Sequence, residues 1–337
     1  MPEMTYSAAL NSAIKEEMDR DSRVFVMGED IARWGDSGGV FGVTKGLVDY
    51  FGAERIIDTP ISEGGFVSIG VGAALAGSRP IIEIMYSDFL TLAMDPIVNQ
   101  AAKMRYMSGG QTCVPLVIRS NLGASGGKAA QHSQSFETWF IHVPGLKVVV
   151  PSSPSDAKGL LLTAIRDDNP VLFLEHKLLY FMKGEVPEDQ EAIPFGVASV
   201  LLEGSDITVV ATQWMLQYAL KAAGELSKEG ILVEVIDPRT LVPFDAETVL
   251  ESVKKTGRLV VVHEAVERGG WAGEVVATVV DRAFDYLDAP IRRICAKNLP
   301  VPYTRQLEQQ VIPGYKEILE GIRSAYRGEE LNHGIQS

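Results

Sequence analysis

The sequence predicts an α/β protein with two domains, and three observations support this prediction. The chain has 337 residues, which is more than a single ordinary hydrophobic core accommodates. Short apolar, β-branched segments alternate with helical segments in two successive series. A polar, acidic stretch containing a proline, Lys183 to Glu191, separates the two series and is typical of a linker. We therefore expect domains at 1–185 and 201–337, joined by a linker at 186–200.

The first series predicts a parallel sheet. Its strand candidates are continuous apolar runs, as expected for strands buried on both faces. They are Val24–Met27, Ile81–Met85, Leu116–Arg119, Lys147–Val150 and Val171–Glu175. Helical periodicity predicts the intervening helices Thr5–Arg20, Gly65–Gly77, Asp88–Met107 and Ser155–Arg166.

The second series predicts a smaller α/β domain of ordinary size. Its expected strands are Ile207–Ala211, Ile231–Ile236, Leu259–His263 and Ile291–Ile294. Its expected helices are Trp214–Lys228, Ala246–Lys255 and Ala272–Phe284.

Composition excludes several classes of protein. The 44 acidic and 31 Lys and Arg residues give a net charge of −13, which argues against nucleic acid or an anionic membrane as the main partner. No segment approaches the ~18 apolar residues of a membrane span, and the N-terminus has no signal-peptide pattern. We therefore expect a cytoplasmic protein. The two cysteines, Cys113 and Cys295, lie beside apolar segments and are expected to be free thiols.

Glu63 is the first candidate for a catalytic residue. The extended run Arg55–Asp58 meets Pro60, and Glu63 then precedes two glycines and a helix of small residues. A strand end, a turn and a helix start can direct one carboxylate into a cleft. The alternative is that Glu63 only favours the helix N-terminus electrostatically.

His132 is the second candidate. It follows the glycine-rich segment Gly123–Lys128 and lies between polar side chains, a setting that suits proton transfer or an anion contact. A solvated loop histidine is the alternative. Met85 and Phe89 flank a predicted strand end, where apolar side chains either pack in the core or hold a flat ring in an α/β cleft.

Several segments together resemble a known family. They are DTPISE at Asp58–Glu63, DPIVNQAAK at Asp95–Lys103, QHSQ at Gln131–Gln134 and VIDPRTL at Val235–Leu241. The chain, from Thr5 to about Tyr326, resembles the β subunit of the thiamine-diphosphate-dependent component of 2-oxo acid dehydrogenase complexes. Within that family LEHKLLY at Leu174–Tyr180 is most similar to acetoin dehydrogenase β subunits, with pyruvate dehydrogenase β subunits close behind.

The resemblance implies the fold and the cofactor. It implies an N-terminal thiamine-pyrimidine-binding domain with a parallel sheet and a C-terminal transketolase-like α/β domain. In this family thiamine diphosphate lies between an α and a β subunit, and the α subunit holds the diphosphate through Mg²⁺. The superfamily's Gly-Asp-Gly motif with a later Asn is matched only in part, by Gly35-Asp36-Ser37. This departure fits a site divided between two chains.

The resemblance also implies residue roles. Glu63 matches the glutamate that hydrogen-bonds a nitrogen of the cofactor's pyrimidine ring, and His132 matches a histidine that assists proton transfer or acylation of lipoamide. Ile61, Met85 and Phe89 match positions that contact the pyrimidine. A structural potassium site is implied at Leu116, Ala164, Ile165, Asp167 and Asn169. The alternative for that segment is a plain helix-ending turn before a proline.

The expected assembly is an α₂β₂ heterotetramer in which the second domain mediates contact between β subunits. It would cleave a carbon–carbon bond of acetoin or a 2-oxo acid and transfer the acyl group to lipoyl groups of an acyltransferase core. A pyruvate or branched-chain 2-oxo acid substrate is the alternative within the family. A transketolase-like or deoxyxylulose-phosphate-synthase-like enzyme and a non-catalytic scaffold subunit are the alternatives outside it.

Overall fold

The computed structural model describes residues 2–32 and 38–329. They form two compact units, each with a largely parallel sheet, which confirms the predicted fold class. The main division falls between Phe195 and Gly196. The first unit comprises Met1–Ser125, Gln131–Phe195 and Thr240–Pro243, and the second comprises Gly126–Ala130, Gly196–Arg239 and Phe244–Ser337.

The first unit contains a seven-stranded sheet in the order β12-β6-β7-β5-β4-β2-β3. All pairs are parallel except β12 with β6. Every residue of β4, β5 and β7 is buried, because helices cover both faces of such a sheet. The strands are β2 (Val24–Gly28), β3 (Ile56–Asp58), β4 (Arg79–Ile84), β5 (Val117–Leu122), β6 (Lys147–Val149), β7 (Val171–His176) and β12 (Thr240–Val242).

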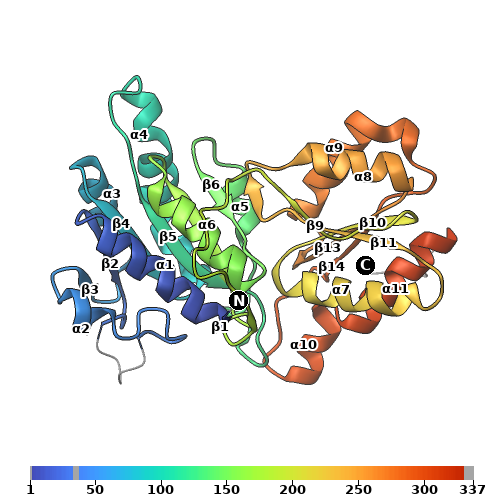
Figure 1. The fold of residues 1–337 in the computed structure, drawn as a ribbon, viewed down its shortest axis with the longest axis horizontal. Helices are drawn as coiled ribbons and strands as arrows, with labels where there is room; N and C mark the ends of the chain where they lie inside the picture. The colour runs from blue at the N-terminus through green and yellow to red at the C-terminus, as the bar shows by residue number, and fades with distance from the viewer. Residues whose placement is uncertain (1, 33–37, 330–337) are drawn as a thin grey trace. The chain divides into compact units, whose positions relative to one another are not determined.

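Helices α1 (Tyr6–Arg20) and α6 (Pro154–Arg166) pack together on one face of this sheet, and α3 (Glu63–Leu75) packs on the other (Figure 1). The hydroxyl of Thr5 caps α1 by accepting from the Ala8 amide at 3.2 Å, as expected of an N-cap threonine. The small residues of α3 allow close packing, because a Cβ at Gly70 would lie 2.9 Å from the Ile82 side chain. Shorter helices are α2 (Leu47–Phe51), α4 (Ala102–Met107) and α5 (Glu137–Ile141).

One local expectation is corrected by the structure. The predicted single helix over 88–107 is a 3₁₀ segment, η1 (Ser87–Ala93), a π-helical turn, η2 (Asp95–Ala101), and α4. Pro96 is the second residue of the π segment, a position in the first turn where a proline is tolerated, whereas it breaks a helix interior. The start of the polar stretch forms β8 (Lys183–Glu185), which pairs antiparallel with β1 (Glu3–Thr5).

The second unit has a five-stranded sheet in the order β14-β13-β10-β11-β9, parallel except for β9. Helices α7 and α11 pack together on one face and α8 and α9 on the other (Figure 1). The strands are β9 (Ser199–Leu202), β10 (Ile207–Ala211), β11 (Val233–Asp237), β13 (Leu259–Val266) and β14 (Arg292–Ala296). The helices are α7 (Gln213–Ser227), α8 (Ala246–Thr256), α9 (Trp271–Ala283), η3 (Phe284–Tyr286), α10 (Arg305–Val311) and α11 (Tyr315–Arg327).

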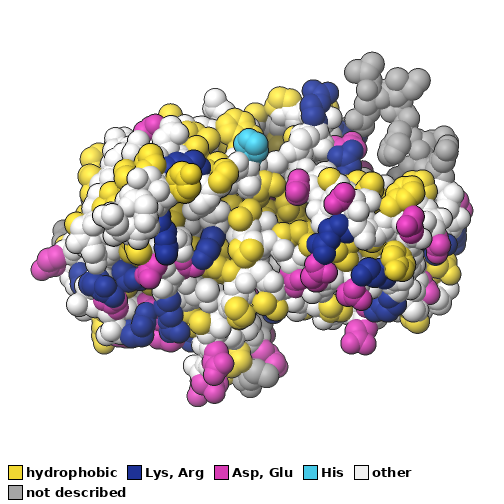
Figure 2. All heavy atoms as spheres, turned by 90° about the horizontal axis from the view of Figure 1, so that it is seen from above, with side chains coloured by type: hydrophobic (Ala, Val, Ile, Leu, Met, Phe, Trp, Pro, Cys, Tyr) yellow, Lys and Arg dark blue, Asp and Glu magenta, His cyan; other side chains and the backbone are white. Residues whose placement is uncertain are grey.

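The face drawn in Figure 2 carries acidic, basic and hydrophobic side chains mixed over both units. Within residues 2–32 and 38–329, no helix is both long enough and apolar enough to cross a membrane.

Candidate active site

Three of the expected functional residues, together with Glu29, follow the carboxyl ends of parallel strands in the first unit. Glu29 follows β2, Glu63 follows β3, Met85 follows β4, and the chain leaving β5 leads to His132. Strands β3 and β4 lie on opposite sides of β2, so the direction of winding reverses there. Ligands of open α/β sheets bind beside the carboxyl ends at such a reversal, which makes this edge the candidate site.

Glu63 is the first residue of α3, and its side chain is buried, with only 5% of its surface exposed. The next residue must be small, because a Cβ at Gly64 would lie 3.0 Å from the carbonyl oxygen of Leu92. The helix start is thus held tightly against the segment that follows β4. The N-terminal end of a helix suits an acidic side chain, and this one lies at the edge of the sheet.

Glu29 is a second carboxyl group beside Glu63, and sequence reasoning missed it. Burial, followed by the charges of Glu63 and Asp30, raises the pKa of Glu29 to about 7. Its Oε1 atom is buried and has no hydrogen-bond partner among residues 2–32 and 38–329. A carboxyl group poised near neutral pH can hold or release a proton, which is a common property of active sites. The sequence feature that could have identified Glu29 is its position directly after an apolar strand.

His132 packs against two aromatic rings. Its imidazole lies edge-on to Tyr86, at 5.3 Å between ring centroids, and to Phe89, at 5.4 Å. Its carbonyl oxygen accepts a hydrogen bond from the Lys177 ammonium at 2.8 Å. The adjacent Gln134 donates its side-chain amide to Asp88 at 2.8 Å. The histidine is thus held in the first unit and is not a freely solvated loop residue.

The three expected ring-contacting residues differ in exposure. Met85 is buried, Phe89 is half-buried against His132, and Ile61 is 81% exposed. A single exposed isoleucine is not unusual in itself. In this chain Ile61 lies two residues before the buried Glu63, so the candidate site has an apolar residue displayed at its margin.

Several buried polar atoms around the same edge lack partners within the described ranges. Native proteins leave few buried polar atoms unsatisfied, and such groups call for an explanation. A ligand or partner chain covering this edge supplies one, because oxygen acceptors and hydroxyls suit a ligand with amino groups and ring nitrogens. One side-chain oxygen is involved in each of Glu29, Thr59, Asp88, Asn121, Ser133 and Ser135.

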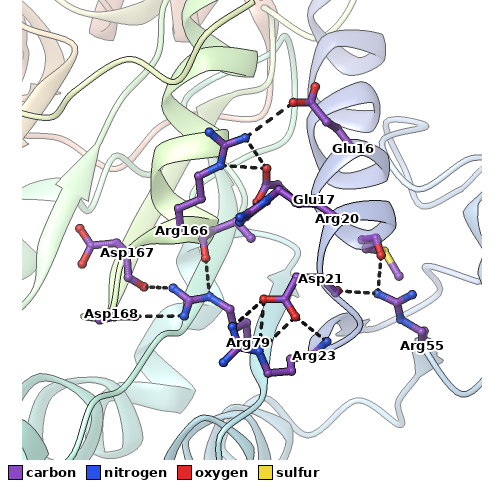
Figure 3. Close-up of polar contacts among 12 residues, drawn as sticks. Glu16, Glu17, Arg20, Asp21, Arg23, Arg55, Arg79, Arg166, Asp167 and Asp168 are labelled. Atoms are coloured by element: carbon purple, nitrogen blue, oxygen red, sulfur yellow. Dashed lines mark hydrogen bonds and ion pairs between the residues drawn. The ribbon is translucent and has the colours of Figure 1, made fainter.

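The positions expected to hold potassium surround a guanidinium group. Arg79 donates to the carbonyl oxygens of Ile165 at 2.9 Å and Asp167 at 2.8 Å, and it pairs with the Asp168 carboxylate at 3.0 Å (Figure 3). The other expected ligand positions are also engaged, since the carbonyls of Leu116 and Ala164 accept backbone amides and the Asn169 side chain accepts from Arg105. A carbonyl oxygen has two lone pairs, so these oxygens permit a cation but do not require one.

The partial diphosphate motif, Gly35-Asp36-Ser37, lies outside the described residues.

The fold and the site define a class of protein. Residues 2–183 match the family model "Transketolase, pyrimidine binding domain", and residues 196–318 match "Transketolase, C-terminal domain". A solved structure described as "Split gene transketolase, inactive beta4 tetramer" has the same fold, with a TM-score of 0.79 at 20% identity over 97% of this chain and 99% of that one. The chain is therefore a two-domain protein of the transketolase-like, thiamine-dependent class.

Curated relatives narrow the class to a family. "Pyruvate dehydrogenase E1 component subunit beta" of Rickettsia felis is 49% identical, covering 95% of this chain and 98% of the relative. "Acetoin:2,6-dichlorophenolindophenol oxidoreductase subunit beta" of Cupriavidus necator is 48% identical, covering 96% and 98%. The same subunit of Bacillus subtilis is 48% identical, covering 92% and 93%. The chain belongs to the family of pyruvate and acetoin dehydrogenase β subunits.

The structure also brings Lys177 and Tyr86 to the site, and neither was a sequence candidate. Lys177 is the first residue after β7, and Tyr86 is the second residue after β4. A polar or aromatic residue directly after a buried parallel strand was the available signal, since such residues meet at one edge of the sheet.

Proposed function

We propose that this chain is the catalytic β subunit of a thiamine-diphosphate-dependent dehydrogenase that acts on acetoin or a 2-oxo acid. It pairs with an α subunit as an α₂β₂ heterotetramer and passes the acyl group to lipoyl groups of an acyltransferase core. The observation that carries the proposal is the buried Glu63, beside Glu29, at the point where the winding of the sheet reverses.

The residues present fit the pyrimidine end of the cofactor. Thiamine diphosphate, when bound, supplies the carbanion chemistry that carbon–carbon cleavage requires. Glu63 would hydrogen-bond a pyrimidine nitrogen, and Ile61, Met85 and Phe89 would contact the ring. The α subunit would hold Mg²⁺ and the diphosphate.

Each catalytic side chain then has a physical task. Glu63 would place a buried carboxylate against the pyrimidine ring, where an electrostatic contact is stronger than in water. His132 can move a proton at its imidazole, which Tyr86 and Phe89 hold in place. A scaffold subunit would have no need for a buried Glu63 beside a half-buried carboxyl group of raised pKa at this edge.

Acetoin is the substrate that we propose first, because of the segment Leu174–Tyr180. Pyruvate and branched-chain 2-oxo acids are the alternatives. The identities of 49% to a pyruvate dehydrogenase relative and 48% to an acetoin relative do not distinguish acetoin from pyruvate as the substrate.

Reconstitution tests the proposal. The chain is combined with a cognate α chain, thiamine diphosphate and Mg²⁺, and dye reduction is followed with acetoin, pyruvate and branched-chain 2-oxo acids. We expect turnover from the pair and none from the isolated chain. Cofactor-dependent turnover by the isolated chain would contradict a site divided between two subunits. A correctly assembled pair that neither binds cofactor nor turns over substrate would instead support a non-catalytic scaffold subunit.

We also propose that potassium occupies the turn at Ala164, Ile165, Asp167 and Asn169 beside Leu116, sharing carbonyl oxygens with Arg79. Oxygen ligands on a turn suit a hard cation. Thermal unfolding is measured in potassium, sodium and choline chloride at one ionic strength. A midpoint higher in potassium alone supports the site. Equal midpoints would contradict potassium binding and leave the turn to the side chains of Arg79, Lys147 and Arg105.

A further inference from the structure

Lys177 lies beneath the loop that carries His132. It is the first residue after β7, and only 2% of its surface is exposed. Its Nζ atom donates to the carbonyl oxygen of Gly123 at 3.1 Å and to that of His132 at 2.8 Å. One ammonium group therefore binds Gly123, where the loop begins after β5, and His132, the catalytic candidate near the end of the loop.

The same ammonium group contacts the ring against which His132 packs. The Nζ atom lies 4.6 Å from the centroid of the Tyr86 ring, a distance at which a cation is attracted to an aromatic face. Tyr86 in turn meets the His132 imidazole edge-on at 5.3 Å. Lys177 thus acts on the backbone of His132 and on one of the two rings that orient its side chain.

The loop of His132 is bound through its backbone: the Gly123 amide donates to the Gln134 carbonyl at 3.2 Å, and the Gly126 and Gly127 amides donate to Glu308 at 2.9 Å. Gly123, Gly126, Gly127 and Ala129 all have positive φ angles, and the segment between Gly123 and His132 contains neither helix nor strand. Glycines in such conformations carry no side chain that could anchor the loop. Of these backbone contacts, the one from Lys177 is made to His132 itself.

We propose that Lys177 is a positioning residue for His132, and that its ammonium group holds the imidazole against Tyr86 and Phe89. The proposal rests on the role of His132 in the proposed function. Lys177 acts through His132 and Tyr86 and does not itself exchange a proton with substrate. A displacement of about 1 Å in a catalytic group can cost on the order of 100-fold in rate. Lys177 can therefore affect turnover without contacting the substrate.

The chain offers a matched control for a buried lysine. Lys158 on α6 is 4% exposed and pairs with Glu16 at 3.4 Å. Lys158→Met removes a buried ammonium group from the same unit without touching the loop of His132. Lys177→Met removes the two hydrogen bonds and keeps a side chain of similar length, and Lys177→Arg keeps the positive charge and N–H donors.

The first readout does not depend on activity. Amide hydrogen exchange over residues 123–134 is measured in the full-length chain and in the assembled enzyme. We expect faster exchange in Lys177→Met, a rate near wild type in Lys177→Arg, and no change over this segment in Lys158→Met. Exchange that is unchanged in Lys177→Met overturns the proposal whatever the activity shows.

The second readout is a double-mutant cycle in the assembled enzyme with a lipoyl acceptor. Lys177→Met is expected to lower kcat on the order of 10- to 100-fold with a smaller change in KM, and to cause no further loss when His132 is already alanine. Independent, multiplying losses overturn the proposal. If His132→Ala alone keeps wild-type turnover, the proposed role of His132 fails, and the exchange measurement still decides whether Lys177 positions the loop.

Discussion

Glu29 and Glu63 bring two carboxyl groups together at the carboxyl ends of the adjacent strands β2 and β3. Burial, and then the negative charge of Glu63, raises the pKa of Glu29 from its ordinary value of 4.5 to about 7. The first prediction follows from this relationship. Between about pH 4.5 and 7 the folded chain binds more protons at Glu29 than the unfolded chain does, so this group makes the free energy of unfolding fall as pH rises through that range.

Glu29→Gln should remove that fall, so the variant should gain stability relative to wild type as pH increases from 5 to 8. Chemical unfolding of the full-length chain at several pH values measures the difference. Glu54→Gln, at an exposed position of the same unit, is the control. A constant difference between Glu29→Gln and wild type at every pH would show that Glu29 titrates normally.

The second prediction is that Glu63→Gln folds and assembles but activates the cofactor poorly. The amide keeps the shape of the buried side chain and removes its negative charge. The loss of one preorganised electrostatic contact commonly costs about 3 kcal/mol, or roughly two orders of magnitude in rate. Proton–deuterium exchange at the thiazolium carbon of bound cofactor measures the effect, with circular dichroism as the folding control. Exchange as fast as in wild type would reduce Glu63 to a helix-start residue.

The third prediction concerns His132. His132→Ala should leave assembly intact, because the residue belongs to an irregular loop and not to the core. Lipoyl acylation or an earlier proton transfer should slow by ~10²-fold or more, the usual loss for an acid–base group. His142→Ala, at the exposed C-cap of α5, is the matched control. Equal turnover in the two variants would make His132 an ordinary loop residue.

The fourth prediction concerns a buried ion cluster. Arg119 on β5 donates to Glu175 at 2.7 and 2.8 Å and to Glu83 at 2.6 Å, and burial raises the pKa of Glu175. Arg119→Met leaves two buried carboxyl groups without their cation and should cost about 3–5 kcal/mol of unfolding free energy. Arg23→Met, which breaks the ion pair that the exposed Arg23 makes with Asp21, should lower the free energy of unfolding far less, because solvent screens an exposed ion pair. Urea unfolding measures both variants. If Arg119→Met lost no more unfolding free energy than Arg23→Met, the ion cluster would contribute little to stability.

The sequence by itself determined the class of fold and the segments that carry the candidate catalytic residues. Continuous apolar runs predicted the buried parallel strands, because burial on both faces leaves no polar alternation to preserve. The same pattern placed Glu63 and the segment of His132 after strand ends, where α/β proteins bind ligands. The helix from 88 to 107 was predicted wrongly, since apolar periodicity does not distinguish α from 3₁₀ or π segments around Pro96.

Only the tertiary structure decided which residues share the site. Glu29, Tyr86 and Lys177 lie far from His132 in the chain, and they come near Glu63 or His132 because parallel strands align their carboxyl ends at one edge. The raised pKa of Glu29 depends on burial and on the charge of Glu63, and neither is encoded locally. In the sequence, Lys177 is simply a lysine that follows a strand. It can position His132 only because folding brings two carbonyl oxygens and an aromatic ring to its ammonium group.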